Sequence, residues 1–289
     1  MSEKAGTFKA VEIPDKDKTS INFLYTTIPG RMLLSILTKA AVSKLAGSIL
    51  RCPASRFHIK GFIKRNNIDM DEYRNTKYRS FNDFFIREIK EGFRPFPESK
   101  NDVAAPSDGK LTAYQISSNS VFSIKNSKYS VSDLLGDKKL ADEYNNGTCL
   151  IFRLSPDDYH RYSFIDDGEI LEKRRIEGKL HTVRPIACQQ FDVFCQNSRE
   201  YTVIQTANFG KIIQMEVGAL FVGRISNYNN SKNVKRGDEK GMFQFGGSTI
   251  ILLFRENEIK VSKEIYENTQ KNKETVVKMG NKTGEKKQQ

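Results

Sequence analysis

The first place in the sequence that could do chemistry is a serine, Ser248, which follows two glycines and precedes a run of β-branched and apolar residues. A hydroxyl becomes a nucleophile when a base takes its proton, and a preceding glycine leaves the neighbouring carbonyl open and permits a sharp turn. The same pattern is also typical of a Gly-Gly turn that enters a buried strand. The Gly-x-Ser-x-Gly elbow of serine hydrolases is absent here, so that class is a poor fit.

Few residues could supply the base. The chain has three histidines, His58, His160 and His181, and imidazole is the side chain that exchanges protons near neutral pH. A carboxylate often supports the imidazolium that forms, and Asp108 in the segment PSDG is a candidate for that role. Taken alone, PSDG predicts a surface turn, and a lone histidine predicts a packed, hydrogen-bonded residue.

Composition narrows the classes of protein to consider. The 289 residues are 38% hydrophobic and 28% charged, with a mean hydropathy of −0.55, which indicates a globular chain with a sizeable core. The net charge of +12 favours a polyanionic partner, either anionic lipid or nucleic acid, and the lack of a nucleic-acid-binding motif argues against the second. Four cysteines without close pairing indicate reduced thiols, and the polar first 18 residues predict a cytoplasmic setting.

The elements that must position these residues change in character after Pro95. Residues 20–92 predict helices, because apolar side chains recur every three or four positions in 32–50 and again in 81–89. Lys39 and Lys44 argue against a membrane span over 32–50, which predicts a helix that either packs on the core or lies at a lipid interface. Short β-rich runs then predict a mixed or barrel-like sheet, with strands at residues 110–116, 149–154, 201–206, 211–217 and 249–254.

Six further segments give the Gly-Gly-Ser-Thr motif its context. In chain order they are FNDFFIR (81–87), PSDG (106–109), LSPDDYHR (154–161), TVRP (182–185), VGALFVG (217–223) and RGDEKG (236–241). This ordered set resembles the phosphatidylserine decarboxylase family, in the branch whose Gly-Gly-Ser-Thr motif follows a phenylalanine. The resemblance covers roughly residues 20 to 260.

The resemblance implies a proenzyme that cuts itself. Ser248 attacks the carbonyl of Gly247, and the resulting ester eliminates and hydrolyses to leave a pyruvoyl group at the new amino end. The pyruvoyl group is then the covalent cofactor: it forms a Schiff base with the serine amine of the lipid and accepts electrons as carbon dioxide leaves. Asp108 and His160 match the family's relay aspartate and the first histidine of its Tyr-His-Arg-x-His block, and no metal is implied.

One position departs from the family pattern. The second histidine of that block, the family's base for self-cleavage, is replaced by Ser163, and a serine cannot collect a proton at neutral pH. Two alternatives keep the reaction: His160 serves both steps, or His181 supplies the missing imidazole as a compensating base. His181 is also interpreted more simply, as a packing residue where relatives carry an aromatic.

These points predict an α+β protein with an N-terminal helical segment packed on or beside a β-rich catalytic domain. We expect a helical, membrane-associating region over residues 1–95 and a catalytic domain over 96–267 that contains the 247/248 cleavage site. Residues 268–289 are rich in Lys, Asn, Gln and Glu and predict a flexible basic tail.

The resemblance also implies partners and a location. It implies phosphatidylserine in membranes as the substrate, a heterodimer of the cleaved large and small chains, and a peripheral position on the cytoplasmic side of the cell membrane. Association into a homo-oligomer is left open. Two other functions fit the residues: a pyruvoyl decarboxylase with another amino substrate, and an uncleaved, inactive lipid-binding relative in which Ser163 has removed the base.

Overall fold

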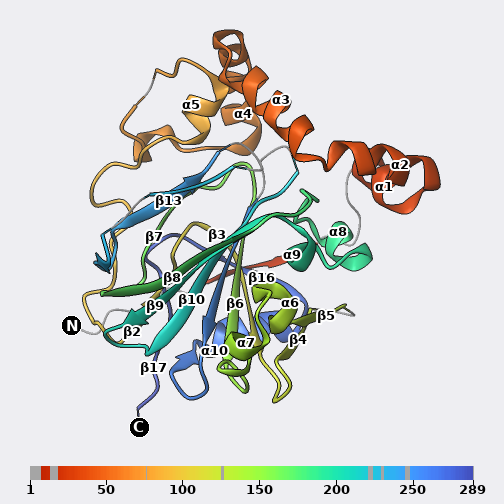
Figure 1. Cartoon of the computed structure of the whole chain (residues 1–289). Coiled ribbons are helices and arrows are strands. Elements are labelled where there is room, and N and C mark those ends of the chain that lie inside the picture. The colour runs from red at the N-terminus through yellow and green to blue at the C-terminus, as the bar shows by residue number, and fades with distance from the viewer. Residues whose placement is uncertain are drawn as a thin grey trace.

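The computed structural model describes residues 8–13, 19–75, 77–124, 127–220, 224–228, 231–244 and 248–288. Helices of the N-terminal third lie at one end of the molecule, above a large twisted sheet that forms its body (Figure 1). Helix and strand both contribute extensively, and the strands pair antiparallel. The predicted α+β class is therefore confirmed.

The helices are α1 Thr19–Thr26, α2 Ile28–Leu37, α3 Ala40–Arg51, the 3-10 helix Pro53–His58, α4 Ile59–Asn66, the 3-10 helix Met70–Glu72, α5 Phe81–Phe85, α6 Val131–Leu135, α7 Lys138–Asp142, α8 Pro185–Gln190, α9 Val193–Gln196 and α10 Lys263–Gln270. The strands are β1 Lys9–Glu12, β2 Asp102–Ala104, β3 Gly109–Gln115, β4 Val121–Ile124, β5 Ser127–Ser130, β6 Thr148–Leu154, β7 Arg161–Ser163, β8 Gly168–Ile176, β9 Arg199–Thr206, β10 Lys211–Val217, β11 Ile225–Asn227, β12 Asn233–Val234, β13 Glu239–Phe243, β14 Ser248–Phe254, β15 Ile259–Val261, β16 Lys273–Val277 and β17 Lys282–Lys286.

The largest sheet has nine strands in the order β1-β16-β3-β6-β14-β10-β9-β8-β12. Its central strand is β14, which is buried along its whole length and pairs with β6 on one side and β10 on the other. A strand covered on both faces needs apolar, β-branched side chains at nearly every position, and the sequence STIILLF supplies them. Pairings between the named strands are antiparallel, so of the two alternatives expected from the sequence the mixed sheet is wrong.

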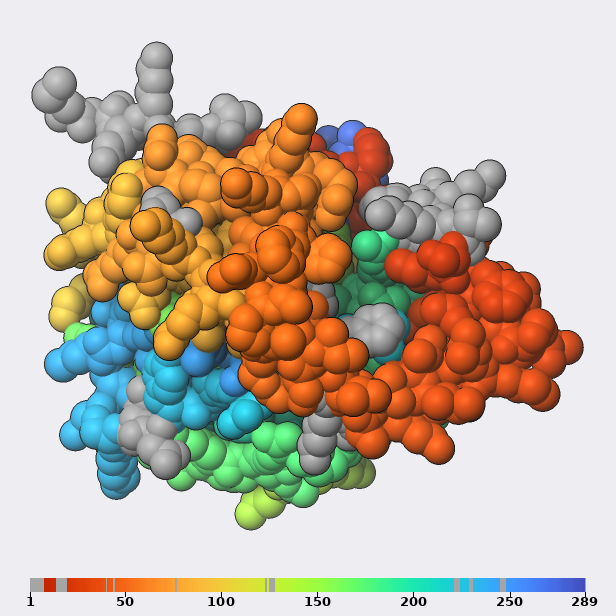
Figure 2. Space-filling view, turned by 90° about the horizontal axis from the view of Figure 1, so that it is seen from above, coloured from red at the N-terminus to blue at the C-terminus, as the bar shows by residue number. Residues whose placement is uncertain are grey.

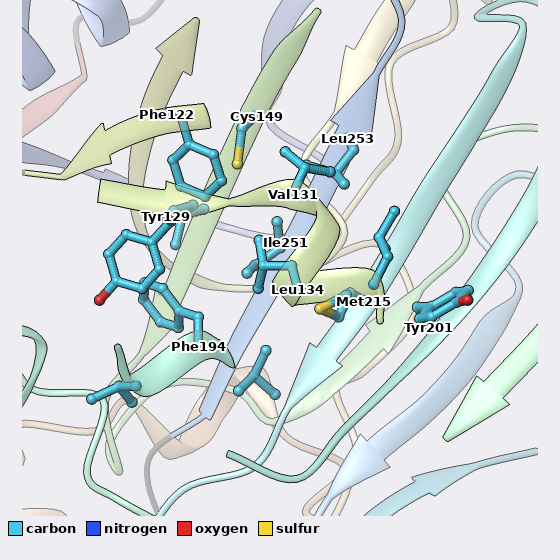
Figure 3. Packing of buried hydrophobic residues seen from close by; sticks show 14 of the residues in the cluster. Phe122, Tyr129, Val131, Leu134, Cys149, Phe194, Tyr201, Met215, Ile251 and Leu253 are labelled. Atoms are coloured by element: carbon cyan, nitrogen blue, oxygen red, sulfur yellow. The ribbon is translucent and has the colours of Figure 1, made fainter. Parts of the chain in front are cut away.

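Two hydrophobic cores lie on the two faces of this sheet. Ile251 and Leu253 of β14 point into the first core with residues of α6, α8 and α9, part of which is seen in Figure 3. Ile250 and Leu252 point into the second core, which is closed by α10 and by two three-stranded sheets, β11-β13-β7 and β15-β17-β2. Because side chains alternate along a strand, Ser248 lies on the side of the second core.

The N-terminal helices begin with conventional signals. Thr27 caps α2 by accepting a hydrogen bond from the Gly30 amide, and Ser80 caps α5 through the Asp83 amide. Helices α1 to α4 occupy much of the face seen in Figure 2, in red to orange, and project at its rim. Within the described residues no single helix is long and apolar enough to cross a bilayer; only the pair Ile28–Leu37 and Ala41–Arg51, bent by 69°, meets that test when the two are taken together.

The C-terminal segment corrects one expectation. Residues 268–289 were expected to form a flexible tail, but β16 lies between β1 and β3 in the main sheet and β17 lies between β15 and β2. The polar composition was a poor guide because β16 buries Thr275 and Val277 and also the charged Glu274, which pairs with Arg153. The strand β1 near the N-terminus completes this edge by pairing with β16, so the region before residue 95 is not wholly helical.

Candidate functional site

Ser248 is the first residue of the central strand. It pairs in register with Leu154 of β6, and its side chain is fully buried. Gly247, the residue expected on the other side of the cleaved bond, lies outside the described residues. The strand thus holds the candidate nucleophile at a fixed place on the second-core side of the sheet.

His160 is the side chain that reaches Ser248. The distance from the Ser248 Oγ to the His160 Nδ1 is 3.3 Å. On the other side of the ring, Nε2 lies 3.0 Å from the carbonyl oxygen of Ser155. A carbonyl can only accept a hydrogen bond, so Nε2 carries the proton and Nδ1 of the neutral ring accepts from the serine hydroxyl. Phe85 stacks on the imidazole at 4.0 Å and fixes its plane.

The surroundings of His160 keep its ring uncharged. Burial lowers the pKa of His160 well below its ordinary value, and the positive charges of Arg87 and Lys110 lower it further, against the opposing hydrogen bond to Ser155. A neutral imidazole at pH 7 can accept a proton. The pair Ser248–His160 therefore has the arrangement of a nucleophile with its base.

Asp108 lies in a different set of contacts. Its Oδ1 accepts from the Arg94 Nε at 2.9 Å and from the Met279 amide at 2.8 Å, and its Oδ2 accepts from the Arg94 Nη2 at 2.8 Å. Arg94 also pairs with Glu72 at 2.8 Å. Gly109 follows with a φ of 153°, and a Cβ there would lie 2.9 Å from the Arg153 carbonyl oxygen, so glycine lets β3 approach β6.

Ser163 occupies the position of the missing histidine. Its hydroxyl lies 3.4 Å from the Met279 sulfur, and its amide donates to the carbonyl of Pro106. Met279 in turn donates its amide to Asp108. Ser163 thus lies close to Asp108, as the family pattern implies, but the described contacts bring no imidazole to this carboxylate.

His181 lies on the opposite side of the sheet from Ser248. Its ring stacks on Phe191 at 4.7 Å, and its Nδ1 lies 3.5 Å from the Tyr25 hydroxyl; both neighbours pack in or against the first core. Burial, with a smaller effect of Lys179, lowers the pKa of His181 to about 4. The structure therefore brings together Ser248 and His160. His181 instead packs between Tyr25 of α1 and Phe191, the residue that follows α8.

Three residues around the site were not singled out from the sequence. Phe85 and Arg87 belong to the segment FNDFFIR and contact the ring of His160 and the loop before it, and Arg94 pairs with Asp108. The signal that could have found Arg87 is its position: a charged side chain at the end of a run of phenylalanines is expected to be partly buried and therefore to need partners.

The fold and the site define a class of protein. It is an α+β protein with a buried serine–histidine pair at the first residue of a central antiparallel strand, in which a backbone carbonyl holds the far side of the imidazole. A sequence model of the family described as Phosphatidylserine decarboxylase matches residues 81–285. The chain belongs to the phosphatidylserine decarboxylase family, which places it among the decarboxylases, a class of lyases.

Similar curated proteins extend over nearly the whole chain. Phosphatidylserine decarboxylase proenzyme 2 of Clostridium acetobutylicum is 50% identical over 266 residues, 92% of this chain and 91% of that protein. The phosphatidylserine decarboxylase proenzymes of Fusobacterium nucleatum and Ruminiclostridium cellulolyticum are 40% and 42% identical, over 99% and 91% of this chain and 97% and 90% of their own length. The resemblance read from the sequence is thus confirmed.

Proposed function

We propose that this chain is a proenzyme that cleaves itself between Gly247 and Ser248 and then converts phosphatidylserine to phosphatidylethanolamine and carbon dioxide. The observation that carries the proposal is the 3.3 Å contact between the Ser248 hydroxyl and the unprotonated Nδ1 of His160. The names of the similar proteins, which describe phosphatidylserine decarboxylase proenzymes, support both the processing and the substrate.

His160 is the base in this proposal. It accepts the proton of Ser248 at Nδ1 while Nε2–H stays bonded to the Ser155 carbonyl, so the imidazolium that forms keeps one hydrogen bond. Phe85 and the surrounding core exclude water from the pair, since His160 and Ser248 are both fully buried. Because His181 lies across the sheet, the geometry favours His160 for both the self-cleavage and the decarboxylation step.

The position of Ser248 at the start of β14 fits a pyruvoyl group formed from its carbon skeleton, whose ketone oxygen comes from water as the serine nitrogen leaves as ammonia. Such a group supplies a ketone that forms a Schiff base with the amine of the substrate and takes up the electron pair left as carbon dioxide departs. Pairing of β14 with β6 and β10 anchors the new amino end after the peptide bond breaks. His160 remains within reach of that end as a proton donor or acceptor.

A membrane is the proposed place of action. Residues 19–66 contain eight Lys or Arg and no Asp or Glu. Apolar side chains are exposed on the same helices, with Ile28 77%, Met32 68% and Ile36 53% exposed at four-residue spacing on α2. A helix face of this kind enters the acyl boundary while neighbouring cations meet anionic headgroups. We therefore propose peripheral attachment through α2 and α3, with phosphatidylserine as both lipid partner and substrate.

Release of carbon dioxide tests this function. Vesicles of phosphatidylserine, free serine and buffer are each incubated with the purified chain and with Ser248→Ala, which lacks the hydroxyl. We expect release from the lipid alone and only with Ser248 present. Release from free serine but not from the lipid would instead support a pyruvoyl decarboxylase with another amino substrate.

Ser163 favours a second candidate, an uncleaved lipid-binding relative. A serine there leaves Asp108 without the imidazole of the family pattern. If the native chain stays intact and inactive while Ser163→His cleaves, the second candidate is correct. If the native chain cleaves without the substitution, Ser163 is compatible with processing and this candidate is excluded.

A further inference from the structure

Arg87, two residues after α5, is a buried cation without a carboxylate partner. Its side chain is among the largest fully buried ones, and the whole residue is 2% exposed. Neighbouring cations are paired: Arg94 with Asp108, Lys110 with Asp158 and Arg161 with Glu239. Among the described residues no acidic side chain pairs with Arg87. An uncompensated charge in the interior is costly, so its presence calls for a reason.

The contacts of Arg87 are directed at the loop that leads to His160. Its Nη2 donates to the carbonyl oxygens of Asp157 at 3.0 Å and Asp158 at 3.2 Å, and lies 3.2 Å from the Tyr73 hydroxyl. The guanidinium also lies over the rings of Tyr73 at 4.5 Å and Phe84 at 4.9 Å. The Nε and Nη1 groups have no hydrogen-bond partner within the described part of the chain. Cation–π contacts offset part of the cost of burial.

This loop transmits the position of Arg87 to His160. The Asp158 carboxylate accepts from the Ser155 amide at 2.6 Å, and the Asp158 amide donates to the Ser155 carbonyl at 2.9 Å. That same carbonyl holds the Nε2 of His160. Lys110 secures the opposite side of the loop through the Asp158 carboxylate at 2.8 Å. The Ser155 carbonyl, which sets the orientation of the imidazole, therefore belongs to a closed turn, and Arg87 donates hydrogen bonds to two carbonyls of that turn.

We propose that Arg87 is a positioning residue for the reaction: it holds the 155–160 turn through the carbonyls of Asp157 and Asp158, and this turn orients His160 toward Ser248. The inference rests on the proposed function, in which His160 is the base. Arg87 itself touches neither Ser248 nor, in the described contacts, the reacting bond. Both carbonyls accept from the single nitrogen Nη2, which is held in place because the planar guanidinium lies over Tyr73 and Phe84; a lysine keeps the charge but lacks this planar group.

The charge of Arg87 acts on His160 together with few others. The cations that lower the pKa of His160 are Arg87 and Lys110, and burial is the larger cause. Asp158 faces Lys110 from the same loop, whereas Phe85 of α5, Ser248 of β14 and the backbone of Phe243 in β13 present uncharged groups to the histidine. Removal of the Arg87 charge should therefore raise the pKa of His160, while removal of the planar guanidinium should displace the ring.

Histidine nuclear magnetic resonance separates these two effects. The chain has only three histidines, so the ring signals of His160 can be titrated in a Ser248→Ala background that cannot cleave, with His58 and His181 as internal references. Arg87→Met should move the His160 midpoint upward, and Arg87→Lys should leave it unmoved because the charge is kept. In the chain with Ser248 intact, Arg87→Lys should slow self-cleavage by about 10²-fold, the size of a misplacement of about 1 Å.

Arg74→Met is the matched control. Arg74 belongs to the same N-terminal region but is 58% exposed and lies 3.7 Å from Glu88, and this variant should leave both the midpoint and the cleavage rate unchanged. The inference is overturned if Arg87→Met leaves the His160 midpoint in place, or if Arg87→Lys cleaves at the native rate. Failure of this inference can be distinguished from failure of the proposed function. The titration uses the Ser248→Ala chain, which never cleaves, so its result does not depend on whether the native chain cleaves.

Discussion

At the scale of single residues, the site differs from a hydrolase triad. The difference is the imidazole nitrogen that faces the candidate nucleophile. In the triad the far nitrogen donates to a carboxylate, whereas here Nε2 of His160 donates to the Ser155 carbonyl and Nδ1 faces Ser248. A carbonyl fixes the tautomer without adding a negative charge that would stabilise the imidazolium. The carboxylate expected for this role, Asp108, binds Arg94 instead.

Substitution of the two buried histidines separates their roles. His160→Gln should slow self-cleavage by about 10²- to 10⁴-fold, because general-base assistance is worth that much. His181→Phe should cleave normally, since an aromatic ring keeps the stack on Phe191. The rates are followed on denaturing gels of freshly purified proenzyme. If His160→Gln cleaves normally and His181→Phe does not cleave, the general base is His181 and not His160.

Asp108→Asn distinguishes a structural from a relay carboxylate. Both oxygens of Asp108 bind the buried Arg94, and removing one partner of a buried pair costs about 3 to 5 kcal/mol in unfolding free energy. We expect this loss in chemical denaturation, with cleavage retained where the variant is folded. Asp102→Asn, which breaks a pair with the half-exposed Lys282, is the control and should cost about 1 kcal/mol or less. If Asp108→Asn is nearly as stable as the native chain but does not cleave, Asp108 acts as a relay carboxylate.

At the scale of elements, the C-terminal strand β16 is part of the sheet that carries Ser248. Glu274 of β16 makes a two-bond pair with Arg153 of β6 at 2.7 and 2.5 Å, across β3, and the Met279 amide that follows binds Asp108. In the proposed cleaved form, these contacts would join the small chain to the large one, in addition to β14 itself. The polar strand β16 and the apolar strand β14 would thus act together to hold the two proposed chains.

Truncation tests this role of β16 and β17. A chain that ends at Lys271 should lose its cooperative thermal transition and its self-cleavage, because the sheet then lacks the strand between β1 and β3. Removal of residues 288 and 289 alone is the control and should change neither property. A truncated chain that melts like the full one would show that residues 272–289 do not stabilise the fold.

The sequence predicted the centre of the sheet well and its margins poorly. Runs at 201–206 and 211–217 are strands in the structure, because they are rich in β-branched and aromatic side chains and are buried at most positions. The exposed strand Gly168–Ile176, with GEILEKRRI, and the C-terminal strands show no such run, so their pairing is set by neighbours distant in sequence. Ser248 and His160, the candidate nucleophile and base, were singled out from their motifs, whereas the partners of Asp108 and the side of the sheet on which His181 lies required the fold.

At the scale of the whole molecule, the exposed apolar side chains are concentrated at the end formed by the N-terminal helices. Besides those of α2, Leu45, Ile49 and Phe57 are 65%, 61% and 77% exposed, and exposed Arg and Lys residues lie between them. Exposed patches of this kind mark interaction surfaces. The remaining exposed large apolar residues of the described chain, such as Leu171 on β8, are scattered.

Vesicle binding tests this surface. Replacement of Ile28, Met32 and Ile36 together by Gln should lower the affinity for phosphatidylserine-containing vesicles by about 10²-fold or more, because each buried side chain contributes about 1.5 kcal/mol or more. Leu171→Gln removes an exposed apolar side chain on β8 and should bind as the native chain does. Cosedimentation measures both. Equal binding of the triple variant and the native chain would exclude α2 as the lipid-contacting element.

Intact-mass spectrometry of the purified chain addresses the central claim most directly. The account predicts two polypeptides, one that ends at Gly247 and one of 42 residues, from 248 to 289, whose first residue carries a ketone in place of the serine amine and hydroxyl. A single uncleaved mass that persists on incubation, with the Ser248 hydroxyl unmodified, would contradict it.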